Sequence, residues 1–254
     1  MKEVYKMFFS KNEEDKAKLV NEVLSKDSFD KLNIELIDID LKIEFGNSFE
    51  IHYRGPLDEK PSVEFKNDVL EVKEPNVDRN HGKFWKKGFI EVNVVSHNDS
   101  GNLVVTVPDG HHLSEIKTTT VSGDTDIKNL IVDSLAIFAV SGDINLNKVQ
   151  SDEVKLTTTS GDIDLKKVVV RQGKVKLTSG DFKIEDSTVF DELKVSTTSG
   201  DNLVKDVKAA QYRLSTLSGD NSLFGKNRST EKVNSGNSEG TIVLSTLSGD
   251  NTVK

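Results

Sequence analysis

The residues that could do chemistry recur in one tripeptide, Ser-Gly-Asp, which the second half of the chain repeats seven times. Successive copies are 19, 19, 19, 20, 19 and 30 residues apart. A hydroxyl and a carboxylate at this spacing could supply a nucleophile or metal ligands. A nucleophilic serine, however, works once, beside a base, and has no reason to recur seven times. The repeat is therefore interpreted as structural, and no catalytic residue is assigned to it.

The aspartates of the tripeptide would form a column if successive repeats stacked on one another. Like charges about 5 Å apart repel each other, so the column needs a compensating interaction. Either each carboxylate accepts a hydrogen bond from a corner amide and remains in water, or the column holds cations. We favour amide bonding, and we predict no metal site and no cofactor.

Other catalytic or metal-binding patterns are missing from the sequence. The chain has no cysteine, and its histidines lack any metal-ligand spacing. Neither a Gly-x-Ser-x-Gly elbow nor a phosphate loop occurs, and no unrepeated cluster of acids and bases stands out. These observations predict that the protein is not an enzyme, and they leave a polysaccharide-cleaving β-helix enzyme as the least favoured alternative.

Basic residues recur five places before the serine of the repeat, which predicts a positive stripe along one face. We favour an ordinary solvated face for this stripe, and the alternative is a track for a linear polyanion, such as teichoic acid or an acidic glycan. Its members are Lys117, Lys155, Lys174, Lys194 and Arg213.

A second basic and aromatic group lies in residues 77–89, which include Trp85, the only tryptophan, and Lys86. This segment could contact a glycan ring or an anionic surface. It could equally form a long hairpin whose aromatic side chains fold back on the protein, and we favour this structural interpretation.

The elements that position these residues are short strands. Before each tripeptide, apolar residues and threonine alternate with polar residues, as in Val154, Leu156 and Thr158, which indicates a half-buried strand. After the tripeptide the alternation changes parity, as at Ile163 and Leu165, so the chain must bend at the glycine. The predicted corner glycines are Gly123, Gly142, Gly161, Gly180, Gly200, Gly219 and Gly249.

Two strands and a bend in each period of 19 residues predict an all-β fold. The expected architecture is a single-chain parallel β-helix, a β-solenoid with about 19 residues per coil and coils about 4.8 Å apart. Residues 1–31 are expected to form an arm and a short helix from Asn12 to about Ser25. Residues 32–112 should form irregular first coils or a small sheet, and residues 113–254 the regular repeats.

Composition narrows the function classes. The net charge of −8 argues against nonspecific binding of nucleic acid, and no apolar run is long enough to span a membrane. The first nine residues are too short and too charged to be a signal peptide. The content of hydrophobic residues, 35%, suits the thin core of a solenoid better than a large globular core.

The end of the repeat region raises the question of partners. The 30-residue step holds an insertion at residues 225–240, and residues 241–247 then form the last predicted strand. If that strand ended the solenoid, its backbone would be an open edge, which proteins normally cover or pair. The insertion could fold over it, a second chain could pair with it, or further chain could follow. We favour pairing with another copy, which predicts a homo-oligomer.

Residues 154–165 and 103–110 resemble the bacterial putative-adhesin domains with β-strand repeats. The resemblance covers roughly residues 32–254. It implies a repetitive β fold and a protein of the cell envelope or the extracellular space, and it brings no catalytic or ligand residues. The favoured function is a non-enzymatic surface or envelope scaffold that binds an envelope polymer or another protein. The alternative is a structural solenoid that self-assembles end to end.

Overall fold

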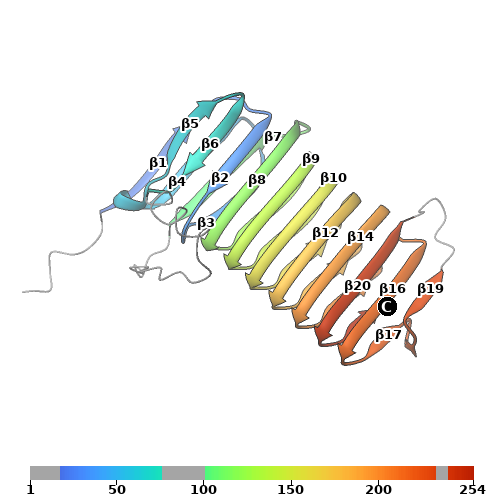
Figure 1. The fold of residues 1–254 in the computed structure, drawn as a ribbon. Coiled ribbons are helices and arrows are strands. Elements are labelled where there is room, and N and C mark those ends of the chain that lie inside the picture. The colour runs from blue at the N-terminus through green and yellow to red at the C-terminus, as the bar shows by residue number, and fades with distance from the viewer. Residues whose placement is uncertain (1–17, 76–100, 233–239) are drawn as a thin grey trace, which may run out of the picture.

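The computed structural model describes residues 18–75, 101–232 and 240–254. In this part of the chain, 21 strands join into one hydrogen-bonded sheet that winds into an open solenoid (Figure 1). One hydrophobic core runs through it from Phe29 to Val253. The protein is therefore all-β, as the sequence predicts.

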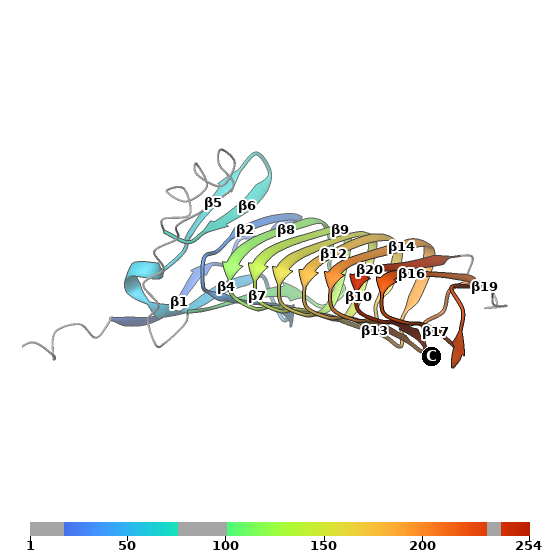
Figure 2. The ribbon, with the colours of Figure 1, turned by 60° about the horizontal axis from the view of Figure 1, so that its bottom comes forward.

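The N-terminal coils are irregular and carry the first six strands. A hairpin of β5 and β6 rises from this end, and β1 and β4 lie beside it (Figure 2). The short 3-10 helix η1 (Leu57–Glu59) joins β4 to β5. The strands are β1 (Leu19–Ser25), β2 (Lys31–Glu35), β3 (Asp40–Gly46), β4 (Glu50–Pro56), β5 (Ser62–Lys66) and β6 (Val69–Lys73).

The predicted N-terminal helix is wrong over the residues that the structure describes. Leu19–Ser25 is strand β1, which pairs antiparallel with β4, and residues 12–17 lie outside the described part. An isolated helix of about a dozen residues is marginal in water. Pairing with β4 instead satisfies the backbone groups along an edge that would otherwise be open.

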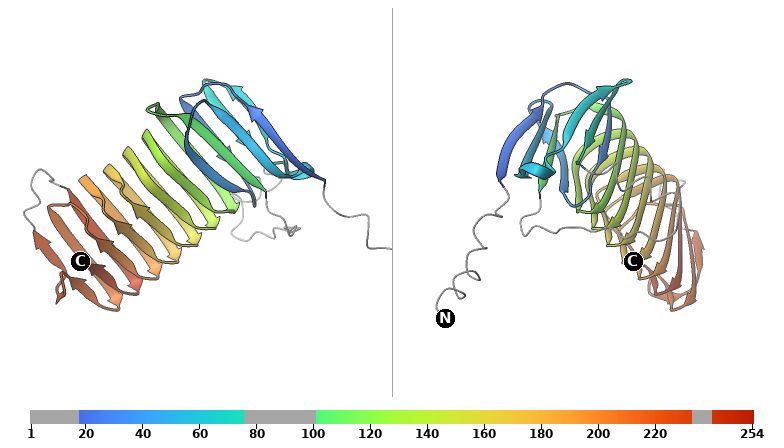
Figure 3. Two further views of the ribbon diagram at one scale, coloured as in Figure 1. Left: turned by 180° about the vertical axis from the view of Figure 1, so that it is seen from behind. Right: turned by 60° about the vertical axis from the view of Figure 1, so that its left-hand side comes forward.

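The regular coils follow, stacked like slices along one axis (Figure 3). From β8 to β15, neighbouring strands are parallel and shifted by one sequence repeat, so that Ile144 pairs with Thr125 on one side and Ile163 on the other. β7 is parallel to β3 and antiparallel to β4. The strands of the regular coils are β7 (Asn102–Pro108), β8 (His112–Ser122), β9 (Thr125–Ser141), β10 (Ile144–Ser160), β11 (Ile163–Lys166), β12 (Val169–Ser179), β13 (Phe182–Glu185), β14 (Thr188–Ser199) and β15 (Asn202–Lys205).

Within β10, buried residues show how one coil surrounds the core. Ile144 and Leu146 point inward before a corner at Lys148, and Val154 and Leu156 point inward after it. Lys148 has a φ of 55°, in the left-handed region. The part of the coil that ends at the tripeptide is the longer one, and its strands form a wide sheet whose outer surface we call the wide face. Its members among the regular coils are the C-terminal parts of β8, β9, β10, β12 and β14.

The glycines of the tripeptide lie where the wide face ends. Six of them have φ between 124° and 138°, and Gly123 is the exception. At each, a Cβ would overlap the backbone carbonyl oxygen of a neighbouring coil; at Gly161 this is the oxygen of Gly142. The glycine therefore meets two demands, a backbone that L side chains disfavour and a close approach between coils.

The aspartates of the tripeptide form a ladder of hydrogen bonds. The backbone N–H of each donates to Oδ1 of the aspartate in the preceding coil, over N···O distances of 2.7–3.0 Å. This is the amide-bonding arrangement that the sequence favoured. In spatial order the ladder is Asp40, Asp124, Asp143, Asp162, Asp181, Asp201, Asp250 and Asp220.

The order of the last two aspartates reveals that the final coils are exchanged. Strand β20 lies between β14 and β16 (Figure 1). In the same way, β21 pairs with β15 on one side and with β17 on the other. Thus the coil of β20 and β21, which comes last in the sequence, lies between the coil of β14 and β15 and the coil of β16 and β17. We call the coil of β20 and β21 the inserted coil. The strands at this end are β16 (Gln211–Ser218), β17 (Asn221–Leu223), β18 (Lys226–Asn227), β19 (Thr230–Lys232), β20 (Thr241–Ser248) and β21 (Asn251–Val253).

This exchange corrects the predicted C-terminal edge. Ile242, Leu244 and Thr246 are buried in a strand that is paired on both sides, so they are not at an edge. The outermost coil is formed by β16 and β17, and part of the insertion covers it. β19 pairs with residues 211–213 of β16, and β18 pairs with residues 222–223 of β17. Residues 214–221 and 244–251 have identical sequences, so the strand pattern alone could not say which copy lies outside.

A ladder of asparagines fixes the inserted coil from inside. Asn251 accepts a hydrogen bond from Asn202 Nδ2 at 2.8 Å, and its own Nδ2 donates to Asn221 Oδ1 at 2.8 Å and to Ser215 O at 2.9 Å. Thr197 Oγ1 donates to Asn202 Oδ1 at 2.8 Å. Because Asn251 is fully buried, these bonds must replace the water that its amide would otherwise bind.

Candidate functional site

Three of the predicted basic residues meet on the wide face. Lys155, Lys174 and Lys194 lie on the neighbouring strands β10, β12 and β14 in direct register, and all three side chains are exposed. The ends of the predicted stripe do not join them. Ala136 separates Lys117 from Lys155, and Val243 of the inserted coil separates Lys194 from Arg213.

A fourth lysine enlarges this group. Lys176 follows Lys174 on β12 by two residues, so that it is exposed on the same face, beside Thr157 and Ser196 of the neighbouring strands. The sequence reasoning missed it because it followed a single column of the repeat. We call Lys155, Lys174, Lys176 and Lys194 the lysine cluster.

The charges of the lysine cluster are only partly neutralised. Lys194 Nζ lies 2.7 Å from Glu192 Oε2, and Lys117, outside the cluster, is paired with Glu115 in the same way. For Lys155, Lys174 and Lys176 the described part of the chain provides no ion pair. Exposed threonines flank them on the same strands, at Thr159 and Thr178. The surface is thus flat, cationic and rich in hydroxyl groups.

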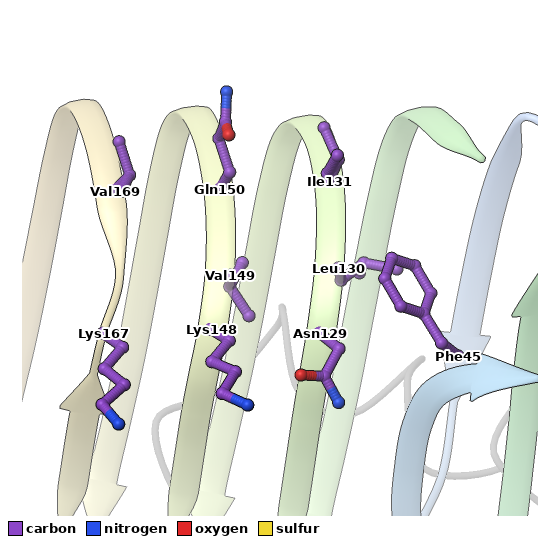
Figure 4. Close-up of a pocket in the computed structure, with 9 residues that line it drawn as sticks. All are labelled: Phe45, Asn129, Leu130, Ile131, Lys148, Val149, Gln150, Lys167 and Val169. Carbon is purple, nitrogen blue, oxygen red and sulfur yellow. The ribbon is translucent and has the colours of Figure 1, made fainter. Parts of the chain in front are cut away.

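A shallow groove of about 270 Å³ lies at the corner of Lys148, where the strands of the wide face begin (Figure 4). Lys148 and Lys167 extend along one margin with Asn129, while Ile131 and Val169 lie along the other. Leu130 and Val149 are set between these rows, and Phe45 closes one end. The groove contains no acid, so it offers no acid–base pair for catalysis.

The remaining predicted site residues separate into two groups. Trp85 and Lys86 lie outside the described residues. The seven glycines of the tripeptide lie at the coil corners, where their role is to let coils approach.

The two adjacent histidines contact different acids: His111 lies 3.2 Å from Asp30, and His112 lies 2.7 Å from Asp133. Across residues 18–75, 101–232 and 240–254, no three acids or histidines gather as a metal site would require.

A model of the Toastrack DUF4097 family matches residues 9–254, nearly the whole chain. The chain belongs to this family. A search of the curated proteins finds no match to this Toastrack chain. In the described segments, no helix has the length and apolar character needed to cross a membrane.

Several solved structures resemble the Toastrack chain over most of its length. A "putative adhesin" from Bacteroides fragilis is 13% identical, with 93% of this chain and 96% of that chain covered and a TM-score of 0.47. A "putative cell adhesion protein" from Clostridium sporogenes is 14% identical, with 94% and 99% covered and a TM-score of 0.39. A "putative lipid binding protein" from Parabacteroides distasonis is 12% identical, with 93% and 97% covered and a TM-score of 0.38.

One buried acid of the Toastrack chain lies near the irregular end. Glu74 is 5% exposed, and its Oε2 accepts the backbone N–H of Ile37 at 2.6 Å. Burial raises the pKa of Glu74 to about 8, and the nearby carboxylate of Asp38 contributes to the rise. Tyr53 is also buried, and its burial, together with the nearby carboxylates of Glu59 and Glu74, raises the pKa of its hydroxyl. Tyr53 OH donates to Pro56 O at 2.8 Å, which indicates a structural role.

The raised pKa of Glu74 predicts a pH-dependent stability. Below pH 4.5, the ordinary value for glutamate, folded and unfolded chains both carry the proton, and the contribution of Glu74 is fully present. Between pH 4.5 and about 8 the unfolded chain releases the proton and the folded chain retains it, so stability falls, by up to about 1.4 kcal/mol per pH unit. We expect Glu74→Gln, which keeps an acceptor for Ile37, to flatten this fall in melts recorded across that window. The control is Glu71→Gln on β6, the strand that Glu74 directly follows. A Glu74→Gln curve parallel to that of the control would contradict the prediction.

Proposed function

We propose that the protein is a non-enzymatic, envelope-associated scaffold whose lysine cluster binds a linear polyanion. In finer detail, we infer a parallel β-helix of about 19 residues per coil that displays this surface. The observation that carries the proposal is the stacking of Lys155, Lys174 and Lys194 on three neighbouring strands.

The spacing of the coils supports a polymeric ligand. Strands in one sheet lie about 4.8 Å apart, so the cluster presents cations at a short, regular interval across the solenoid. A chain of phosphodiesters or uronic acids carries its negative charges at repeated intervals and can contact several lysines at once. Teichoic acids and acidic glycans of the cell envelope have this chemistry. Because the protein as a whole carries a charge of −8, such binding depends on local rather than net charge.

The environment of the cluster favours binding over catalysis. Each free lysine is exposed, and the hydroxyl groups beside it belong to threonines that could donate hydrogen bonds to phosphate or sugar oxygens. Glu74 is the described carboxyl whose pKa is strongly raised, and its burial keeps it away from any ligand on the wide face.

The test compares two triple variants with the same change in charge. Lys155→Gln/Lys174→Gln/Lys176→Gln removes the unpaired cations of the cluster, and Lys148→Gln/Lys166→Gln/Lys167→Gln removes three exposed lysines elsewhere on the same coils. Binding of a purified poly(glycerol phosphate) teichoic acid is measured by calorimetry at several salt concentrations. We expect the first variant to lose at least about tenfold in affinity, equivalent to about 1.4 kcal/mol, and to show a weaker salt dependence.

The control variant should bind as the wild type does. Equal losses in both variants would indicate nonspecific attraction and contradict the assignment of the site. No binding by the wild type to teichoic acid or to an acidic glycan such as polygalacturonate would contradict the proposed function.

A further inference from the structure

The outer end of the solenoid leaves part of one strand uncovered. β20 pairs with the inner side of β16, while β19 pairs with residues 211–213 on its outer side. Ser229 O accepts the N–H of Leu214 at 2.7 Å. For residues 215–218, the described chain provides no strand on the outer side. The unpaired N–H and C=O groups of an edge strand can pair with another strand. Residues 215–218 contain no lysine, proline or bulge that would prevent such pairing.

Apolar side chains gather at this open stretch. Leu217 is 81% exposed, and Leu247, at the same position of the neighbouring strand, is 53% exposed. Coils further from the end carry threonine there, at Thr159, Thr178 and Thr198. The first two repeats carry half-buried Val121 and Val140 at this position, the next three carry threonine, and the last two coils, next to the uncovered edge, carry exposed leucine.

The aspartate ladder also stops here with one acceptor left over. Asp220 donates its N–H to Asp250, but in the described structure no N–H donates to the carboxylate of Asp220. In every earlier coil of the ladder that carboxylate is occupied by the next coil. The edge, the leucines and the free carboxylate occur together where a further strand would lie.

We propose that a second copy of this chain occupies this edge, with the two β16 strands antiparallel about a two-fold axis near Leu217. Within the chain the edge sequence already lies beside a copy of itself, because β16 and β20 share the octapeptide of residues 214–221 and 244–251 and pair in parallel. An antiparallel arrangement brings the exposed Leu217 side chains of both copies together beside Leu247, which removes apolar surface from water.

Charge selects the antiparallel direction. Arg213 and Asp220 flank the free stretch of residues 215–218 on opposite sides, and both are exposed. Antiparallel pairing places Arg213 of each copy near Asp220 of the other, whereas parallel pairing would place the two Arg213 side chains together. The end as a whole does not repel a copy of itself, since the described residues 211–232 and 240–254 hold five cationic and three acidic side chains. These are Arg213, Lys226, Arg228, Lys232 and Lys254, and Asp220, Glu231 and Asp250.

Sedimentation equilibrium of the full chain across a concentration series tests the proposal. We expect a monomer–dimer equilibrium in the wild type, because only a short edge is free and the interface is small. Leu217→Lys should weaken association at least about tenfold without unfolding the protein, since the side chain is exposed. The matched control is Thr178→Lys, which adds the same cation at the same position of β12 and should leave association unchanged.

A charge exchange tests the direction of pairing. Arg213→Asp and Asp220→Arg should each weaken the dimer, and the double variant should restore it, because the exchanged pair is again complementary. Asp220 suits this exchange because its carboxylate supports no further coil. A dimer that tolerates Leu217→Lys, or a double variant as weak as the single ones, would overturn the proposal. So would a wild type that stays monomeric at every concentration, which would leave the edge to a strand of a different protein.

Discussion

Gly161→Ala should lower the free energy of unfolding by on the order of 3–5 kcal/mol, although it adds a single methyl group. Two costs combine at this position. The backbone has a φ of 137°, which L side chains rarely adopt, and the new Cβ would overlap the carbonyl oxygen of Gly142 in the neighbouring coil. Relief of the overlap requires two coils to separate, which weakens the parallel pairing on both sides. Denaturant melts of the variant and the wild type measure the loss.

Two other glycines separate these costs. Gly110 has a φ of 75°, and no atom lies within 4 Å of the point that a Cβ would occupy, so Gly110→Ala isolates the backbone cost, about 1–2 kcal/mol. Gly123 is not in the positive-φ region, but its Cβ would overlap Ile39 O, so Gly123→Ala isolates the overlap. We expect Gly161→Ala to cost more than either. If Gly161→Ala and Gly110→Ala cost the same, close approach between coils is not what selects glycine in the tripeptide.

Asn251→Ala should destabilise the protein by several kcal/mol, even though it lies near the end of the chain. Its amide joins Asn202, Asn221 and Ser215 in a fully buried position. Truncation would leave polar groups of these three residues without partners, at roughly 1–3 kcal/mol for each group that stays dry. The loss also acts on the inserted coil, which holds β14 and β16 together. Thermal and denaturant melts should both record it.

Asn221→Ala is the matched control. Asn221 belongs to the same ladder but is only half-buried at the outer end, where its Nδ2 reaches Ser229 Oγ at 3.5 Å. Water can replace the lost bond there, so the cost should be about 1 kcal/mol or less. Equal effects of the two substitutions would mean that the ladder contributes no more inside the solenoid than at its end.

The regular coils were predictable because their signal is local and repeated. The alternation around residues such as Leu156 and the change of parity after each glycine require inward side chains and a bend, whatever lies in the next coil. The hydrogen bonds of the aspartate ladder followed from the need to compensate a column of like charges. By contrast, the predicted helix ending near Ser25 depended on a short apolar stripe, which pairing with β4 overrode.

The order of the coils could not be read from the repeat. Residues 214–221 and 244–251 are identical, so every local rule fits both slots equally well. The interruption of the basic stripe follows from this order, because β20 places Val243 between Lys194 and Arg213. Asn202 and Asn251 likewise follow a tripeptide rich in turn residues, and asparagine there is easily interpreted as part of the turn. Only the three-dimensional order shows that these amides face inward and meet.

The inserted coil makes the order of synthesis differ from the order in space. Strand β16 is made before β20, and when it emerges from the ribosome the slot beside β14 is still empty. Its eight shared residues offer β14 the same contacts that β20 later makes, so an early, wrongly threaded arrangement competes with the native one. To reach the native arrangement, the position beside β14 must be filled by β20, from residues 240–254, and not by β16. For this Toastrack chain, near-perfect repetition thus carries a kinetic cost that sequence divergence between neighbouring coils would remove.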